Sequence, residues 1–145
     1  MKAAYRVLAG LVAIGVVLQA MFIAWGFFTV GKDIDGGAVF DKNSSDPAGL
    51  ALHGIFGSMV IPLIALLLLI VSFFAKVDGG IKWALYVVGL VVLQIALAFA
   101  AFAAPVVGVL HGANALALLA VAGIAARRAA GAPAAAGAES TKTTA

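Results

Sequence analysis

The two histidines of this chain both stand in the tripeptide Leu-His-Gly. His53 lies in LALHGIFGSM at 50–59, and His111 lies in VLHGANALAL at 109–118. Both stretches are otherwise almost wholly apolar, and an unpaired imidazole in such surroundings costs roughly 2–7 kcal/mol. Each ring therefore needs a partner. Metal ligation through one ring nitrogen would supply it, with the other nitrogen donating to a backbone carbonyl.

The choice of metal follows from the ligands that the chain offers. Zinc takes about four nitrogen, oxygen or sulfur ligands, but the chain has two histidines, no cysteine and no acidic residue in its apolar stretches. Haem brings its own nitrogens and needs only axial ligands. Small residues beside the histidines could leave a slot for a flat macrocycle: Gly54, Gly57, Gly108 and Gly112. The pattern is compatible with one haem held between His53 and His111.

Interhelical packing is the alternative interpretation of the same residues. Glycines in membrane helices often mark close helix contacts, and interhelical polar bonds contribute about 0.6–2 kcal/mol each. Three amides could serve as partners of neutral histidines, namely Gln19, Gln94 and Asn114, the last one turn beyond His111 on the same face. The residues alone leave both interpretations open.

The elements that position these residues are predicted from composition and charge. Hydrophobic residues make up 65% of the 145 residues and charged residues 10%, with a mean hydropathy of +1.19, so lipid must solvate the chain. No charged side chain occurs in 7–31, 47–75 or 83–126, and Pro105 divides the last stretch. Backbone groups in hydrocarbon must pair within helices. We expect an all-α membrane domain over 1–128, with four transmembrane helices at about 5–30, 47–74, 82–102 and 105–127. The first apolar run is too long for a signal peptide, whose apolar region has about 7–15 residues.

The distribution of charge predicts the orientation. Six basic residues share one side of a four-span bundle: Lys2, Arg6, Lys76, Lys82, Arg127 and Arg128. Only Lys32 and Lys42 fall on the other side, so the positive-inside rule places both termini in the cytoplasm and the 31–46 loop outside. The Ala/Gly/Pro-rich segment 129–145 is expected to be a disordered cytoplasmic tail. No basic cluster exceeds two residues, which excludes a nucleic-acid partner and leaves the bilayer as the expected one.

The two Leu-His-Gly motifs belong to a longer internal match. PAGLALHG at 47–54 resembles PVVGVLHG at 105–112, and VVLQ occurs at both 16–19 and 91–94. We therefore expect a two-helix hairpin used twice, with a pseudo-twofold axis along the membrane normal. Each histidine lies six residues after a helix-starting proline, about 9 Å along the axis. Both rings are then expected at one depth near the outer face, facing each other, with Asp46 as a helix N-cap.

The segment 92–119, VLQIALAFAAFAAPVVGVLHGANALALL, resembles one half of the haem A synthase fold, which consists of two fused four-helix bundles with a histidine pair at the outer side of each. Over about 5–128 the chain also resembles a family of small, uncharacterised four-helix bacterial membrane proteins. The resemblance implies haem b ligation by His53 and His111 in a bacterial cytoplasmic membrane. The chain departs from the haem A synthase pattern in having a single bundle, no carboxylate in a helix and no second haem pocket for a substrate. Methyl-group oxidation by one copy is therefore not expected, although a homodimer would rebuild the double bundle.

Two functional hypotheses follow. The first is a b-type haem protein for electron transfer, or for haem sensing or handling, near the outer face and with a redox partner. Two protein ligands would fill both axial positions, which disfavours oxygen binding. The second is a cofactor-free membrane scaffold or accessory subunit. A proton relay is disfavoured because both histidines lie at one depth, and no residue set typical of a hydrolase or nucleotide-binding enzyme occurs, so no catalytic residue is predicted.

Two further expectations concern the helices. Pro62 should kink the second helix because it lacks a backbone donor. Four aromatic residues near the ends of the spans are expected to anchor them at the membrane interface: Tyr5, Trp25, Trp83 and Tyr86.

Overall fold

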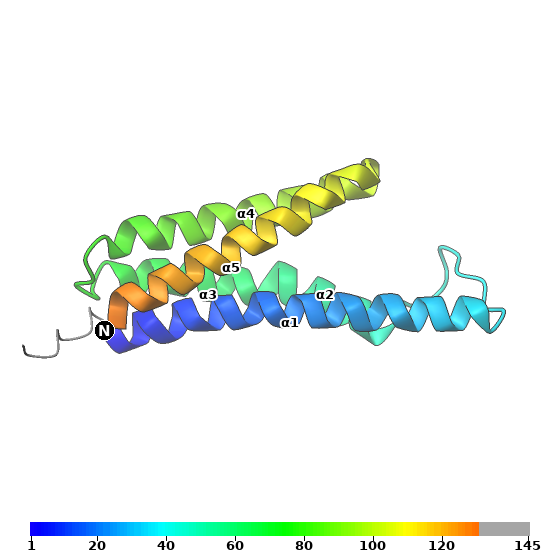
Figure 1. Ribbon diagram of the computed structural model, residues 1–145, viewed down its shortest axis with the longest axis horizontal. Helices are drawn as coiled ribbons and strands as arrows, with labels where there is room; N and C mark the ends of the chain where they lie inside the picture. The colour runs from blue at the N-terminus through cyan, green and yellow to red at the C-terminus, as the bar shows by residue number, and fades with distance from the viewer. Residues whose placement is uncertain (131–145) are drawn as a thin grey trace, which may run out of the picture.

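The computed structural model describes residues 1–130, and these residues form helices joined by short loops, with no strand among them. The first rod is α1 (Lys2–Asp35). The second is continuous and consists of α2 (Ala48–Ile55), a π-helix (Phe56–Val60) and α3 (Ile61–Ser72). The third is α4 (Gly80–Ala103), and the fourth is a 3₁₀ turn (Pro105–Val107) followed by α5 (Gly108–Ala130) (Figure 1).

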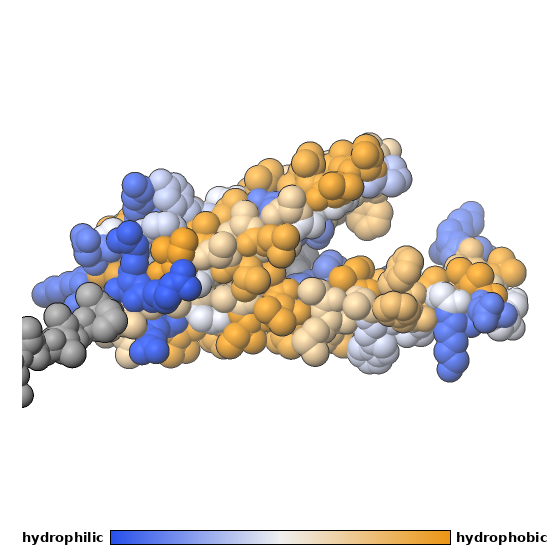
Figure 2. Space-filling model, viewed as in Figure 1, coloured by the Kyte–Doolittle hydropathy of each residue, from blue (hydrophilic) through white to orange (hydrophobic). Residues whose placement is uncertain are grey.

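All four rods are long and apolar enough to cross a membrane, since they contain 34, 25, 24 and 26 residues and a span needs about 20. Large apolar side chains such as Phe27, Phe28 and Phe102 are more than two-thirds exposed. Figure 2 shows apolar surface along the middle of the molecule and hydrophilic residues at its two ends. Lipid must cover this surface, so the predicted four-span, multi-pass membrane protein is confirmed.

The rods form a bundle in which α1 and α4 lie diagonally opposite each other. α1 packs on α3 and α5, and α4 packs on the same two helices. The hydrophobic core between these four helices consists largely of alanines and valines, and Tyr5 and Leu68 are its largest fully buried side chains. Small side chains let the backbones approach closely in a membrane bundle. We call this the closed end of the molecule, where α1 and α4 begin and α3 and α5 stop.

At the opposite end the bundle divides into two arms. α1 with α2 forms one arm and α4 with α5 forms the other, and they diverge towards the tips (Figure 1). The space-filling view shows an open gap between them (Figure 2). We call this the splayed end, and it includes the 36–47 loop and the junction between α4 and α5.

The arm of α1 and α2 depends on a direct contact between two glycines. A Cβ on Gly26 would lie 2.7 Å from the backbone nitrogen of Leu50, and a Cβ on Gly49 would overlap the backbone nitrogen of Gly26. No larger residue fits at either position, because backbone stands where its Cβ would go. This arm is therefore closely packed although the two arms are apart.

Two details at the tips of the first arm differ from expectation. α1 continues five residues beyond 30, and its C-terminal residue is followed by Gly36, whose N–H donates to the Lys32 carbonyl at 3.0 Å. Asp33 and Asp35 thus stand in the last turn of a helix, contrary to the expectation that no helix contains a carboxylate. The expected N-cap at Asp46 is also wrong, because Pro47 occupies that position and no side chain caps the helix.

Pro62 is accommodated by the π-helix immediately before it. The Ile61 N–H donates to the carbonyl of Phe56, five residues back, instead of four. A proline inside an α-helix removes one donor and its ring collides with the carbonyl four residues earlier, and a wider turn relieves that conflict. The helix therefore passes Pro62 without ending.

Tyr5 is not an interfacial anchor, contrary to the sequence-based expectation. Its side chain is fully buried, and its hydroxyl donates to the carbonyl of Gly80 at 2.9 Å. This bond ties the start of α1 to the start of α4 at the closed end. Trp25 and Tyr86 are about half exposed, as expected of anchors.

The expected tail at 129–145 is described only in its first two residues. Ala129 and Ala130 belong to the last turn of α5, which extends three residues beyond the predicted end at 127. Residues 131–145 lie outside the described part of the chain.

Candidate functional site

A cavity of about 840 Å³ lies between the two arms at the splayed end. Cofactor and ligand sites typically have volumes of about 300–1,000 Å³ and mostly apolar walls. Side chains from both arms line this cavity, and most are aliphatic or aromatic. Its polar lining residues are few: Gln19, Asp46, His53, Ser58, Gln94 and His111.

His53 and His111 face each other across this cavity. His53 stands on α2 and His111 on α5, the diagonally opposite helix, and both are half-buried. Their ring centres are 6.3 Å apart, and the ring planes are inclined by 60°. The arms therefore bring together two residues that are 58 positions apart in the sequence.

Each histidine is held by the same kind of hydrogen bond. His53 Nδ1 lies 3.1 Å from the carbonyl oxygen of Gln19, and His111 Nδ1 lies 3.1 Å from the carbonyl oxygen of Gln94. A carbonyl oxygen can only accept, so Nδ1 carries the proton in both rings. In the neutral ring Nε2 then holds the lone pair, which is the arrangement of a histidine that binds a metal through Nε2.

In the second arm, an amide network surrounds His111. Gln94 Nε2 donates to His111 Nε2 at 3.0 Å and to the His111 carbonyl at 3.0 Å. Gln94 Oε1 accepts from Asn114 Nδ2 at 2.6 Å, and Asn114 also donates to the Leu90 carbonyl at 2.9 Å. The lone pair of His111 Nε2 is thus already engaged by Gln94.

The first arm has no such network. Phe56 stands three residues after His53, where Asn114 stands three residues after His111, and it packs against Phe22 with ring centres 5.5 Å apart. Gln19 Nε2 is buried and finds no hydrogen-bond partner within residues 1–130. His53 is held through Nδ1, and its Nε2 makes no hydrogen bond to another described side chain.

The predicted glycines divide into different environments. Gly54, Gly57 and Gly108 line the cavity, whereas Gly112 does not. A Cβ on Gly54 or Gly112 would meet no atom within 4 Å, so neither glycine marks a close helix contact. A Cβ on Gly57 would lie 3.0 Å from Gln19 Oε1. Asn114 is buried behind His111 and does not line the cavity.

The donors in the cavity fit a metal that brings its own equatorial ligands. No group of three or more histidine, cysteine, aspartate or glutamate side chains that could hold a metal ion occurs in residues 1–130. Two imidazoles on one metal need bonds of about 2 Å each, and a five-membered ring with bonds of about 1.3 Å has its atoms about 1.1 Å from the centre. Ring centres about 6 Å apart are therefore required, and the observed separation is 6.3 Å. The separation of the two ring centres therefore suits two axial ligands of one haem iron, but His111 Nε2 faces Gln94 and would have to release that hydrogen bond to bind the metal.

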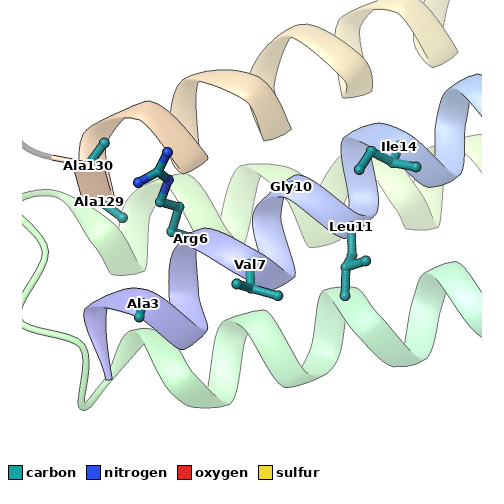
Figure 3. A pocket seen from close by; sticks show the side chains of 8 residues that line it. All are labelled: Ala3, Arg6, Val7, Gly10, Leu11, Ile14, Ala129 and Ala130. Atoms are coloured by element: carbon teal, nitrogen blue, oxygen red, sulfur yellow. The ribbon is translucent and has the colours of Figure 1, made fainter.

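A second hollow, of about 590 Å³, lies near the closed end between the start of α1 and the end of α5 (Figure 3). Its wall is apolar except for Arg6, whose side chain extends from α1 towards Ala129 and Ala130 at the end of α5. It contains no histidine and no amide side chain, so the cleft at the splayed end is the candidate site.

A family of unknown function (DUF6220) matches residues 36–104, a segment that includes His53, Gly57 and Gln94 but ends before His111. This match agrees with the expected relation to an uncharacterised family and assigns no activity to it. No curated protein and no solved structure matches the chain, so the resemblance to haem A synthase stays a prediction.

Proposed function

We propose that this chain is an integral membrane protein that binds one b-type haem in the cleft between its arms, with His53 and His111 as the axial ligands. The observation that carries the proposal is the pair of imidazoles, 6.3 Å apart across the cavity, each with Nδ1 hydrogen-bonded to a backbone carbonyl. Ligation through Nε2 would give the His53 lone pair a partner, which residues 1–130 do not supply.

The polar groups around the cavity also favour this use. Ionisable side chains inside a membrane are costly and mark functional sites by default. The carbonyls of Gln19 and Gln94 hold the two rings in the required tautomer, which strengthens the basicity of a ligating histidine. Gly54, Gly57 and Gly108 have no side chains, so they leave space for a macrocycle beside the two imidazole rings.

We also propose that the two arms are copies of one hairpin, related by a pseudo-twofold axis along the membrane normal. The bond from histidine Nδ1 to a glutamine carbonyl on the preceding helix recurs in both arms at the same length. Both histidines also follow a proline by six residues. The axis would pass between His53 and His111.

The proposed role is electron transfer, or haem sensing or handling, near the outer face of a bacterial cytoplasmic membrane. A haem supplies one-electron exchange when bound, and two protein ligands favour this over oxygen binding. The basic residues at the closed end support a cytoplasmic location of both termini, which would place the cleft in the outer leaflet. A redox protein or a second copy of the chain is the proposed partner.

Absorption spectroscopy of the purified protein tests the proposal. Protein made with added haem should show a Soret band, and the His53→Ala and His111→Ala variants should weaken or shift it. Thr29→Val is a matched control, because the Thr29 hydroxyl bonds only to the Trp25 carbonyl of its own helix, outside the cavity. Wild-type protein without a Soret band, or a band unaffected by both histidine substitutions, would refute haem binding.

One observation favours a second candidate function, a cofactor-free scaffold or accessory subunit. The network of Gln94, His111 and Asn114 is complete without any ligand and links α4 to α5. If His111 had a purely structural role, it would need no partner beyond these hydrogen bonds. This alternative predicts that both alanine variants fold with a modest loss of stability, and that none of the proteins binds haem.

A further inference from the structure

We propose that the two histidines are unequal ligands, with His53 as the permanent one and His111 as one that Gln94 can withdraw. This inference rests on the proposed haem site. It qualifies the preference for electron transfer over ligand binding: when Gln94 withdraws His111, the position on that side is exchangeable and open to a small neutral molecule able to bind iron.

The inequality comes from the partners of the two Nε2 atoms. His53 Nε2 makes no hydrogen bond to a described side chain, so nothing competes with a metal for its lone pair. His111 Nε2 accepts a hydrogen bond from Gln94 Nε2 at 3.0 Å, and metal ligation has to break this bond. The same lone pair cannot serve both partners at once. Gln94 therefore lowers the affinity of His111 for iron, whereas Gln19 does not affect His53 in this way.

Gln94 can compete with iron for the lone pair of His111 Nε2 because Asn114 fixes the orientation of the Gln94 amide. Asn114 Nδ2 donates to Gln94 Oε1 at 2.6 Å, which fixes the amide with its nitrogen towards His111. Asn114 is buried and is itself oriented by a bond to the Leu90 carbonyl. The matching position in the first arm is Phe56, which offers no hydrogen bond. The asymmetry is thus built into the residue types of the two arms.

The walls of the cavity favour a neutral occupant of the exchangeable position. Asp46 is the only charged residue among the described lining residues. Among the described lining residues no lysine or arginine could stabilise an anion, and the apolar side chains beside His111 penalise a charged ligand at that position. A small uncharged molecule, bound to iron in place of His111, meets neither obstacle. Carbon monoxide is a suitable probe of this class.

Carbon monoxide titration of the reduced, haem-loaded protein tests the inference. In Gln94→Leu the competitor for His111 is lost and no new iron ligand is introduced, and an intramembrane hydrogen bond of this kind corresponds to about a threefold to twentyfold change in an equilibrium. Carbon monoxide affinity should fall by that factor and the low-spin fraction should rise. Asn114→Ala should shift both in the same direction by less. Leu93→Met, on the same helix but outside the cavity, is the control.

The histidine variants give a second, independent comparison. His111→Ala should keep haem in a five-coordinate, high-spin form, whereas His53→Ala should lose most of its haem. In the haem-free protein, the ¹⁵N resonance of His111 Nε2 should shift in Gln94→Leu while that of His53 stays unchanged.

The possible failures are distinguishable. A wild-type protein with no Soret band refutes the haem site itself. A normal Soret band, with carbon monoxide affinity and the His111 resonance both unchanged in Gln94→Leu, overturns only the inequality of the ligands. Equal haem loss in the two histidine variants overturns it as well.

Discussion

Replacing each of the two intramembrane glutamines by methionine should have opposite effects on the stability of the haem-free protein. Methionine has nearly the shape of glutamine but no strong hydrogen-bonding group. Gln94→Met removes three hydrogen bonds: two donated by Nε2 to His111 and one accepted by Oε1 from Asn114. Gln19→Met removes an amide whose buried nitrogen has no partner within residues 1–130.

The magnitudes follow from these contacts. Interhelical hydrogen bonds in membranes contribute about 0.6 kcal/mol on average, so the loss of three bonds should lower the free energy of unfolding by about 2 kcal/mol. An unpaired buried donor costs about 1–3 kcal/mol, and part of this is recovered when an apolar side chain replaces it. We therefore expect Gln19→Met to raise stability by about 1 kcal/mol, which makes the two variants differ by about 3 kcal/mol.

Unfolding of the haem-free protein by increasing SDS in mixed micelles, followed by circular dichroism, measures both changes. Ser58→Ala serves as a reference, because the Ser58 hydroxyl bonds only to the Gly54 carbonyl of its own helix. If Gln19→Met destabilised the protein as much as Gln94→Met, Gln19 would have a partner in the membrane, and the reasoning about unequal arms would be wrong.

Three more predictions concern other parts of the molecule. Gly49→Ala should destabilise the protein by about 1–3 kcal/mol in the SDS assay, because the new Cβ would meet the backbone of α1. Gly10 faces open space, so Gly10→Ala should be neutral or slightly stabilising in the same assay. Tyr5→Phe should cost about 1 kcal/mol through the lost bond to the first carbonyl of α4, again measured by SDS unfolding. In the exposed loop, the pKa of Asp41 is lowered mainly by the backbone N–H two residues on and then by the Ser44 hydroxyl. Ser44→Ala should raise this pKa towards its ordinary value in an NMR titration, and an unchanged pKa would contradict the assigned contact. A lowered pKa stabilises the fold at pH values above the ordinary pKa of aspartate, and this contribution is lost as the pH falls through the lowered pKa.

The sequence by itself determined the four membrane spans and the depth of the histidines along them. Long uncharged runs must become helices in hydrocarbon, and six residues after a proline is the same rise in either arm. Two loops were recognisable because their charges cannot enter the bilayer, although the loop predicted at 31–46 begins only at Gly36, since the last turn of α1 carries Lys32, Asp33 and Asp35. These conclusions need no knowledge of which helix contacts which.

Only the tertiary structure decided which side chains meet. Tyr5 carries the signals of an interfacial anchor, yet it is buried because α4 begins beside it. The glutamine amides are alike in the sequence, but Asn114 gives Gln94 a partner, while Phe56 leaves Gln19 without one. Helical periodicity sets the height and face of a residue on its own helix. Distances between helices depend on the packing of the whole bundle, in which small side chains let the rods approach at the closed end while the arms diverge at the splayed end. That arrangement places the centres of the two imidazole rings 6.3 Å apart.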